Sequence, residues 1–325
     1  MPKVSVIINC YNGERYLKEA IDSVYSQTYK DWEIIFWDDA STDNSEQIAR
    51  SYDERLRYFK GKKALSLGQA RNWAIRHAKG ELIAILDQDD IWMPEKLELQ
   101  VSLFENNPSV GLVFSDAIDY YQDTGKSISH FVNLGLQPPR GKIFKYLFTM
   151  DKYPISMPTA IFRRSALESL PEWFDERFKY AEEYDLFLRI AYEWECDYIN
   201  KPLAIHRIHD SSSTKIFHKD ISVELSSVME KILSDHPELL TLFKKEIARN
   251  RSIIALQCGK SLCQMGEKKE ARNILIKHIN HYKCFLFLLG TFLPKKFILN
   301  LLNSYNKLVR GRFLKSKKNP NPKAL

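Results

Sequence analysis

The stretch AILDQDDIWMP, residues 84–94, places three carboxylates directly after an apolar run. The residues LIAIL at 82–86 are all apolar, which is typical of a strand buried on both faces of a parallel sheet. Because a buried strand excludes charge, Asp87, Asp89 and Asp90 are expected where this strand ends. In open parallel sheets, ligands gather at the carboxyl ends of the strands. The stretch therefore predicts a buried strand and a site at its carboxyl end.

The first 115 residues repeat this alternation of short apolar runs with helical patterns. Further strands are predicted at 4–8, 32–37, 56–59 and 111–116, and helices from 17, near 45, at 68–78 and at 94–106. The alternation indicates an α/β fold whose mostly parallel sheet is covered by helices on both faces. Asp38 and Asp39 end the second strand as Asp87 and Asp89 end the fourth. We therefore expect the two acidic pairs to converge at one edge of the sheet.

The charge of the chain changes sign near residue 215. From there to the C-terminus, 22 Lys and Arg stand against 8 Asp and Glu, whereas residues 1–214 carry 26 against 33. The sequence pattern also changes, because apolar residues now recur at the three- and four-residue spacing of helices. We predict two domains: an α/β domain at 1–215 and a helical, basic region at 216–325.

The segment 284–318 alternates apolar clusters with lysines and arginines. This pattern fits a segment that lies in a membrane interface beside anionic lipid, although a solvated helical face or an oligomer contact would also explain it. The apolar run CFLFLLGTFL, 284–293, has half the length of about 20 residues that a spanning helix needs. No secretory signal is visible, and five scattered cysteines indicate neither a disulfide framework nor a zinc site. We expect a cytoplasmic protein, peripheral on the cytoplasmic face of the inner membrane.

Two carboxylates at the mouth of a strand suit a hard divalent cation. Asp87 and Asp89 can share Mg²⁺ or Mn²⁺, which take further ligands from water and substrate phosphates. The alternative is a loop cluster that caps the following helix. Neither the glycine-rich dinucleotide loop nor the GxxxxGK[ST] loop is present, so a metal would replace the glycine-rich turn in binding phosphates. The basic half also lacks a base-reading module, so we expect no nucleic-acid partner.

Two long blocks carry a family resemblance. VSVIINCYNGERYLKEAIDSVYSQTYKDWEIIFWDDASTDNS, 4–45, and GQARNWAIRHAKGELIAILDQDDIW, 68–92, closely resemble the family 2 glycosyltransferases of the GT-A fold, over about residues 1–215. The resemblance implies a Rossmann-like GT-A fold for this part of the chain, and the spacing of apolar residues adds the C-terminal helical region. It also implies inverting transfer of a sugar from a nucleotide-diphosphate sugar, with a UDP-sugar as the expected donor, to a hydroxyl of a surface-glycan, polysaccharide or lipid-linked acceptor. A divalent metal would assist departure of the diphosphate, and a carboxylate would act as the base.

The resemblance also assigns site residues. Nucleotide-sugar contacts fall on Asn9, Tyr11, Asp38, Asp39, Gly68, Arg71, Asp87 and Gln88. The metal falls on Asp89 as the direct ligand, with Asp87, and with His209 of the loop HRIHDSSS facing the metal or the diphosphate. The catalytic base falls on Glu183 in EEYDLFLR, with Glu182 as the alternative base and Asp185 as a structural alternative.

Several alternatives stay open. Glu183 stands where the family usually has Asp, so its carboxylate is one methylene longer. Arg71 could equally pair with a nearby carboxylate, and Trp92 could pack rather than stack on a sugar. An aspartyl phosphatase, a nucleotidyltransferase and a catalytically degenerate transferase that serves as a scaffold are the competing functions. The sequence lacks the motif expected of an aspartyl phosphatase and the glycine-rich first loop expected of a nucleotidyltransferase. In contrast, every position at which a transferase needs an acidic residue is acidic here.

Overall fold

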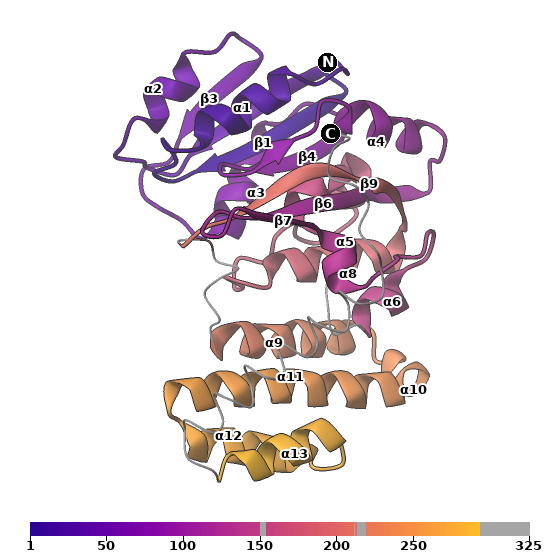
Figure 1. Cartoon of the computed structure of the whole chain (residues 1–325). Helices are drawn as coiled ribbons and strands as arrows, with labels where there is room; N and C mark the ends of the chain where they lie inside the picture. Colours follow the sequence, from indigo (N-terminus) through magenta and orange to yellow (C-terminus); the bar gives the residue numbers. More distant parts are fainter. Residues whose placement is uncertain (150–153, 211, 213–218, 293–325) are drawn as a thin grey trace, which may run out of the picture. The chain divides into compact units, whose positions relative to one another are not determined.

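The computed structural model describes residues 1–149, 154–210, 212 and 219–292. Its N-terminal part alternates strands and helices as the sequence predicts (Figure 1). The elements in order are β1 (Val4–Cys10), α1 (Leu17–Tyr25), β2 (Trp32–Asp38), α2 (Ser45–Arg50), β3 (Leu56–Lys60), α3 (Leu67–His77) and β4 (Leu82–Asp87). Helix α3 begins with a capping box, in which Ser66 accepts from the Gln69 backbone while the Gln69 side chain reaches back to Ser66.

The second half of the sheet combines long strands with short ones. The elements are β5 (Ile91–Trp92), α4 (Lys96–Glu105), β6 (Val110–Tyr121), β7 (Lys126–Ser129), α5 (His130–Leu134), α6 (Phe144–Phe148), the 3-10 turn η1 (Met157–Thr159), β8 (Ile161–Arg163), α7 (Arg164–Glu168), α8 (Glu182–Glu193) and β9 (Glu195–Ile208). The sheet order is β3-β2-β1-β4-β8-β6-β9-β5, and β7 pairs with β6. Strands β3, β2, β1 and β4 are parallel, as are β6 and β9, whereas the short β8 joins the two groups antiparallel.

Helices cover both faces of the parallel strands. One face of β1, β2 and β4 packs against α1 and α4 in a single apolar core, which includes Val6, Ile21 and Val101. Helix α3 packs against the other side of β1 and β2. Burial on both faces explains why these strands are apolar throughout rather than alternating.

The register of the sheet brings the acidic ends of the strands together. Strand β1 lies between β2 and β4, with Cys10 opposite Asp38 and Asn9 opposite Asp87. The convergence expected from the sequence is confirmed, and the candidate site lies at this edge.

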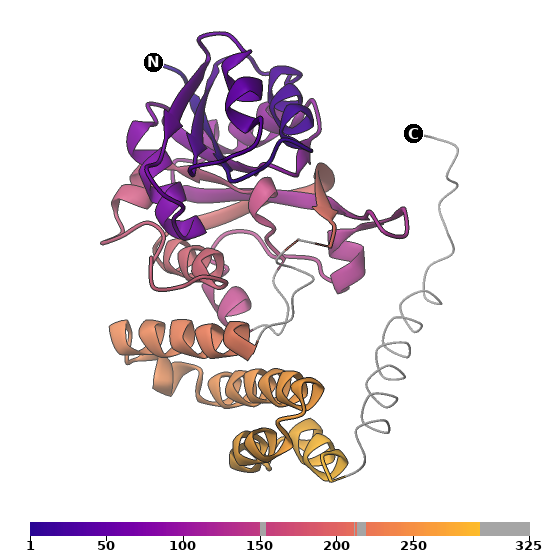
Figure 2. The same ribbon diagram turned by 90° about the vertical axis from the view of Figure 1, so that its left-hand side faces the viewer.

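The chain from residue 219 is helical within the described residues. Its helices are α9 (Lys219–Asp235), α10 (Leu239–Leu242), α11 (Lys244–Met265), α12 (Lys268–Leu275), the 3-10 turn η3 (Ile276–His278) and α13 (Tyr282–Gly290). Helices α11, α12 and α13, orange to yellow in Figures 1 and 2, pack on one another around Leu256, Leu275 and Leu288. Helix α11 ends at Gly266, whose φ of +94° suits the left-handed conformation of a helix C-cap.

The chain divides into two compact units that interleave within α9. The first contains Met1–Ile216 and Ser227–Ile232, and the second contains Phe217–Ser226 and Leu233–Leu325. The domain boundary at residues 215 and 216 stays a prediction. None of the described helices is both long and apolar enough to cross a bilayer. Of the predicted interfacial segment 284–318, the part from 293 onward lies outside the described residues.

Candidate active site

The acidic segment after β4 is held in place by the end of β9. Asp90 is buried, and its carboxylate accepts the backbone N–H of Arg207 at 2.8 Å. The Arg207 side chain donates to the Asp89 carbonyl, and His209 Nε2 lies 2.8 Å from Asp89 Oδ2. The side chains of Asp87 and Asp89 stay 29% and 24% exposed. Two carboxylates are therefore presented to solvent on a fixed backbone.

The loop after β1 is tied to the same segment. Gln88 Oε1 accepts the backbone N–H of Tyr11 at 2.9 Å, and Gln88 Nε2 donates to the Tyr11 carbonyl at 3.3 Å. Gly13 makes this approach possible, because a Cβ there would lie 2.5 Å from Gln88 Oε1 and 2.8 Å from Cys10 Sγ. The Tyr11 side chain is 53% exposed. The predicted nucleotide-lining loop and the acidic segment thus form one continuous wall.

Asn9 has a buried amide without a partner among the described residues. Neither its Oδ1 nor its Nδ2 makes a hydrogen bond, although the residue is only 8% exposed and lies in register with Asp87. Buried polar groups are nearly always paired, so an unpaired buried amide requires an explanation. A polar ligand at this edge of the sheet would supply the missing partner.

Asp38 and Asp39 organise the loops at the adjacent strand end. Asp38 is fully buried and accepts from the Ser41 backbone at 2.7 Å and from the Tyr58 hydroxyl at 2.5 Å. Asp39 accepts the Leu65 backbone N–H at 2.7 Å, and burial raises the pKa of its carboxyl. Neither caps α2; instead the Asp43 carboxylate accepts the backbone N–H of Ser45, the first residue of that helix, at 3.0 Å. Their contact with a nucleotide stays a prediction.

Arg71 is the centre of the site's electrostatics. The residue is fully buried, and its Nη2 donates to Asp87 Oδ1 at 2.9 Å. Its Nη1 donates to Glu183 Oε1 at 2.8 Å and lies 3.5 Å from Glu182 Oε1. Burial opposes the guanidinium charge, but the three carboxylates outweigh it and raise the Arg71 pKa. The geometry favours the ion-pair alternative for Arg71 over direct nucleotide contact.

The two candidate bases differ in accessibility. Glu182, Glu183 and Asp185 lie in the first turn of α8, where the helix dipole favours negative charge. The Glu183 side chain is 32% exposed, whereas that of Glu182 is 4% exposed and packs near Gly68, where a Cβ would lie 3.6 Å from Glu182 Cγ. Burial raises the pKa of Glu183, and Arg71 partly offsets this. Asp185 is fully buried away from Arg71, in ion pairs with Arg189.

A histidine pair that sequence reasoning missed lies beside these carboxylates. Asp119 in β6 is within 3.2 Å of His130 Nδ1 and of His206 Nδ1. Burial lowers the pKa of His206, but the hydrogen bond to Asp119 and the charge of Asp90 outweigh it and raise the pKa to about 9. His206 belongs to the motif HRIHDSSS that singled out His209. Asp119 belongs to no motif, so no sequence pattern pointed to it.

Trp92 belongs to the protein core. It is 2% exposed, and its indole Nε1 donates to the Pro158 carbonyl at 2.7 Å. The ammonium of the fully buried Lys96 lies 4.2 Å from its ring centroid. The packing alternative for Trp92 is therefore the one that the structure supports.

The residues at the edge fit a divalent cation. Asp87 and Asp89 offer oxygen ligands of the kind that Mg²⁺ and Mn²⁺ prefer, and His209 adds an imidazole nitrogen beside Asp89. Within the described residues, no three His, Cys, Asp or Glu side chains gather closely enough to bind a metal by themselves. The donor set suits a cation that also binds water and a diphosphate.

Comparison with known proteins identifies a family and a fold. Residues 5–170 match the model of glycosyl transferase family 2. An uncharacterized glycosyltransferase of Methanocaldococcus jannaschii is 34% identical over 216 residues, which cover 64% of this chain and 71% of that protein. The Escherichia coli enzyme WfgD, a UDP-Glc:alpha-D-GlcNAc-diphosphoundecaprenol beta-1,3-glucosyltransferase, is 40% identical to this chain over 105 residues. These residues cover 32% of this chain and 42% of WfgD.

Two solved structures share the fold. Staphylococcus aureus TarS 1–349 in complex with UDP-GlcNAc matches with a TM-score of 0.57 at 17% identity, over 86% of this chain and 89% of that one. The mannosyltransferase PcManGT from Pyrobaculum calidifontis, in complex with GDP-Man and Mn²⁺, matches with a TM-score of 0.59 at 19% identity. The match covers 94% of this chain and 86% of PcManGT. At these identities the structures establish the arrangement of the elements alone.

Proposed function

This chain belongs to glycosyltransferase family 2 and has the GT-A fold, and from that premise we propose that it transfers a sugar from a UDP-sugar to an acceptor hydroxyl with inversion. The acceptor is a surface glycan, a polysaccharide or a lipid-linked glycan. Asp89 and Asp87 would hold Mn²⁺ or Mg²⁺, which would supply positive charge for the donor diphosphate, and Glu183 is the base.

The observation that carries this proposal is the bridge made by Arg71. It joins Asp87 of the acidic segment to Glu183 of α8 within one guanidinium. Sugar transfer needs two carboxylate functions close together, one at the leaving diphosphate and one at the attacking hydroxyl. The bridge fixes their separation before substrate binds, which supports catalysis by pre-positioned groups.

The proposed reaction is an in-line displacement. The acceptor hydroxyl gives its proton to Glu183 as its oxygen forms a bond to the anomeric carbon, and the bond from that carbon to the diphosphate breaks. A divalent cation, when bound, neutralises charge on the departing diphosphate. Asp89 and Asp87 would bind that cation, with the His209 imidazole beside the Asp89 carboxylate as a further donor.

The names of the relatives support a nucleoside diphosphate sugar as donor. TarS binds UDP-GlcNAc, PcManGT binds GDP-Man with Mn²⁺, and WfgD is named for UDP-Glc and a diphosphoundecaprenol-linked acceptor. We propose UDP as the donor nucleotide because the E. coli relative is named for UDP-Glc. Activity with a GDP-sugar instead would be the alternative result of the test.

A lipid-linked acceptor requires access to a membrane, and α13 offers a surface for it. Its buried side uses Cys284 and Leu288. The outward apolar side chains, together with Phe292 just after the helix, are 42–66% exposed: Tyr282, Phe285, Leu286, Leu289 and Phe292. The surrounding sequence, 215–325, is strongly basic. We propose that this face binds an anionic bilayer on the cytoplasmic side.

The test is nucleotide release from UDP-, dTDP- and GDP-sugars, with thermal stabilisation measured in parallel, in Mn²⁺, Mg²⁺ or EDTA. Metal-dependent release from one donor is the expected result. Absence of both release and stabilisation with every donor, in a protein shown to be folded, would overturn the proposal and favour a noncatalytic scaffold.

A further inference from the structure

We propose that Lys231 of helix α9 is a positioning residue for sugar transfer, because its ammonium group joins the first turn of α8, which carries Glu183, to the segment beside Arg71. The inference rests on the proposed function, since Glu183 is the base there. Lys231 lies outside the region 5–170 that matches the family model, and its proposed role is to hold α8 in position during the reaction.

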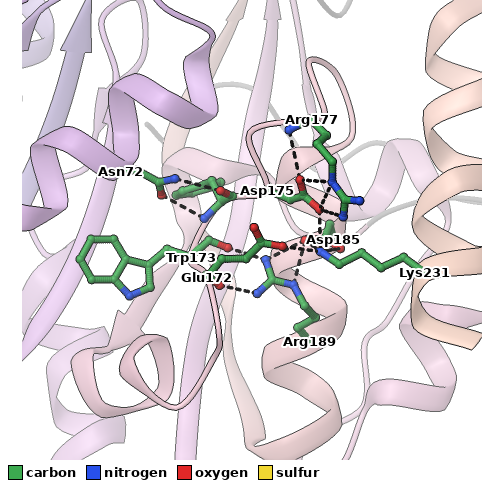
Figure 3. Close-up of polar contacts among 9 residues, drawn as sticks. Asn72, Glu172, Trp173, Asp175, Arg177, Asp185, Arg189 and Lys231 are labelled. Carbon is green, nitrogen blue, oxygen red and sulfur yellow. Dashed lines mark hydrogen bonds and ion pairs between the residues drawn. The ribbon is translucent and has the colours of Figure 1, made fainter. Parts of the chain in front are cut away.

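Three carboxylates surround the Lys231 ammonium (Figure 3). Its Nζ lies 2.7 Å from Asp175 Oδ2, 2.9 Å from Glu172 Oε1 and 3.1 Å from Asp185 Oδ1. Asp175 and Asp185 are 1% and 0% exposed, and the Lys231 side chain is 16% exposed. Lys231 belongs to the same compact unit as its partners, through Ser227–Ile232. The contacts of Lys231 with Asp175 and Asp185 are therefore shielded, whereas the Glu172 side chain is 43% exposed and adds a weaker pair.

The ion pairs around Lys231 connect helix α8 to the irregular segment that precedes it. The residues between α7 and α8, 169–181, form neither helix nor strand. Arg177 pairs with Asp175 inside this segment, and Arg189 pairs with Asp185 inside α8. Lys231 contacts both carboxylates and therefore bridges the segment to the helix. Arg189 adds donations to the carbonyls of Glu172 and Trp173.

The charge of the cluster is balanced. Glu172, Asp175 and Asp185 face Arg177, Arg189 and Lys231. Burial favours the protonated form of Asp175, yet its hydrogen bonds with Arg177 and Lys231 outweigh this and lower its pKa. Loss of Lys231 would leave a shielded region with excess negative charge, and the carboxylates would move apart or toward water.

The bridged segment reaches the site through Phe174. The Phe174 backbone accepts from Asn72 Nδ2 at 2.9 Å and donates to Asn72 Oδ1 at 3.0 Å, next to Arg71 in the chain. The Arg71 guanidinium lies 5.4 Å from the Phe174 ring centroid and donates to Glu183. Lys231 thus acts on Glu183 from two sides, through Asp185 in the same helical turn and through Phe174 behind Arg71.

The functional consequence is a loss of rate rather than of nucleotide binding. Lys231 does not contact Asp87 or Asp89 directly and reaches Asp87 through Phe174 and Arg71, so the affinity for UDP with Mn²⁺ should change far less than the rate. A misplacement of about 1 Å in a catalytic group lowers the rate by about 10²-fold. A purely structural ion pair would lower the unfolding temperature without altering turnover by the folded fraction.

The experiment compares three variants with the wild-type chain. Lys231→Met removes the charge while keeping an extended apolar stem, and Lys231→Arg restores a cation. Lys245→Met removes an exposed lysine of α11 as the matched control. Thermal unfolding fixes a temperature at which all four are folded. Hydrogen–deuterium exchange of peptides covering 172–187 is then measured, with steady-state UDP release and calorimetric binding of UDP with Mn²⁺.

We expect faster exchange at 172–187 in Lys231→Met, with no change in Lys245→Met and recovery in Lys231→Arg. We also expect a kcat about 10²-fold lower in Lys231→Met, with UDP affinity within about twofold of wild type. Unchanged exchange, or a kcat equal to that of wild type, would overturn the inference. If wild type turned over no donor, the proposed function would fail, while the exchange data alone would decide whether Lys231 positions α8.

Discussion

The Arg71 guanidinium donates to the Glu183 carboxylate at 2.8 Å, although the two residues are 112 positions apart in the chain. The arginine is fully buried, and the glutamate is 32% exposed. One partner therefore belongs to the core and fixes the other at the surface of the site. Burial raises the pKa of Glu183, and the charge and hydrogen bond of Arg71 act in the opposite direction.

Removal of the Arg71 charge should move the pH profile. Burial raises the pKa of Glu183 and Arg71 lowers it, so Arg71→Met should raise that pKa further. A base acts only when deprotonated, so the acidic limb of kcat/KM should shift to higher pH. The measurement is UDP release against pH for Arg71→Met and for Arg71→Lys, which keeps a cation and should shift less. Circular dichroism must accompany it, because breaking a buried pair costs about 3–5 kcal/mol of stability. An unmoved acidic limb in a folded Arg71→Met would contradict this account.

The two adjacent glutamates should respond differently to amide substitution. Glu183→Gln removes the accessible carboxylate and should lower kcat by about 10²- to 10⁴-fold with little change in UDP affinity. Glu182→Gln alters the residue packed beside Gly68 and should mainly lower the unfolding temperature. Parallel kinetics and thermal melts separate the two effects. If Glu182→Gln lost turnover and Glu183→Gln retained it, the base assignment would be reversed.

His206 should make the stability of the protein depend on pH in the alkaline range. Its pKa is raised from 6.5 to about 9 in the folded state, so its imidazolium stabilises the fold fully below pH 6.5. That contribution is lost as pH rises through 9 and should amount to about 3 kcal/mol. Urea unfolding between pH 6 and 9.5 in EDTA checks this, and His206→Gln should flatten the curve. Equal slopes for the two proteins would rule out this source of stability.

The outward face of α13 should govern binding to lipid. Phe285→Ser with Leu289→Ser should weaken sedimentation with vesicles that contain anionic lipid, since each removes exposed apolar area from the interface. Leu242→Ser, at a residue of α10 that is 65% exposed, is the control and should bind as wild type. Binding should fall as salt increases and should be weak on neutral vesicles. Wild-type protein that stayed in the supernatant with anionic vesicles would contradict the membrane proposal.

The sequence was most informative where the structure is local and periodic. The strand at 82–86 and the acidic residues after it follow from burial and charge alone, and β4 indeed ends at Asp87. The convergence of Asp38 with Asp87 follows from the geometry of parallel strands and needs no side-chain detail. The family resemblance then supplied residue assignments that no periodicity provides.

Contacts between distant segments were beyond sequence reasoning. The region 117–180 has little periodicity, and β8, only three residues long, joins β4 to β6 there. The alternatives for Arg71 and Trp92 depended on what lies opposite each side chain. Lys96 is buried in the first turn of α4, where a lysine would ordinarily be exposed, because it lies over Trp92 and donates to Gln100. Such placements depend on tertiary packing, which a local pattern does not encode.

The most direct test of the central claim is nucleotide release by wild type and by Asp89→Asn, titrated with Mn²⁺ after EDTA treatment. Asp31→Asn, at an exposed position, controls for the loss of one negative charge. We predict that wild type and Asp31→Asn release UDP in proportion to bound Mn²⁺, whereas Asp89→Asn stays folded, needs far more Mn²⁺ and turns over at least about 10²-fold more slowly. Full Mn²⁺-dependent turnover by Asp89→Asn would contradict the assignment of the metal–diphosphate site to the end of β4.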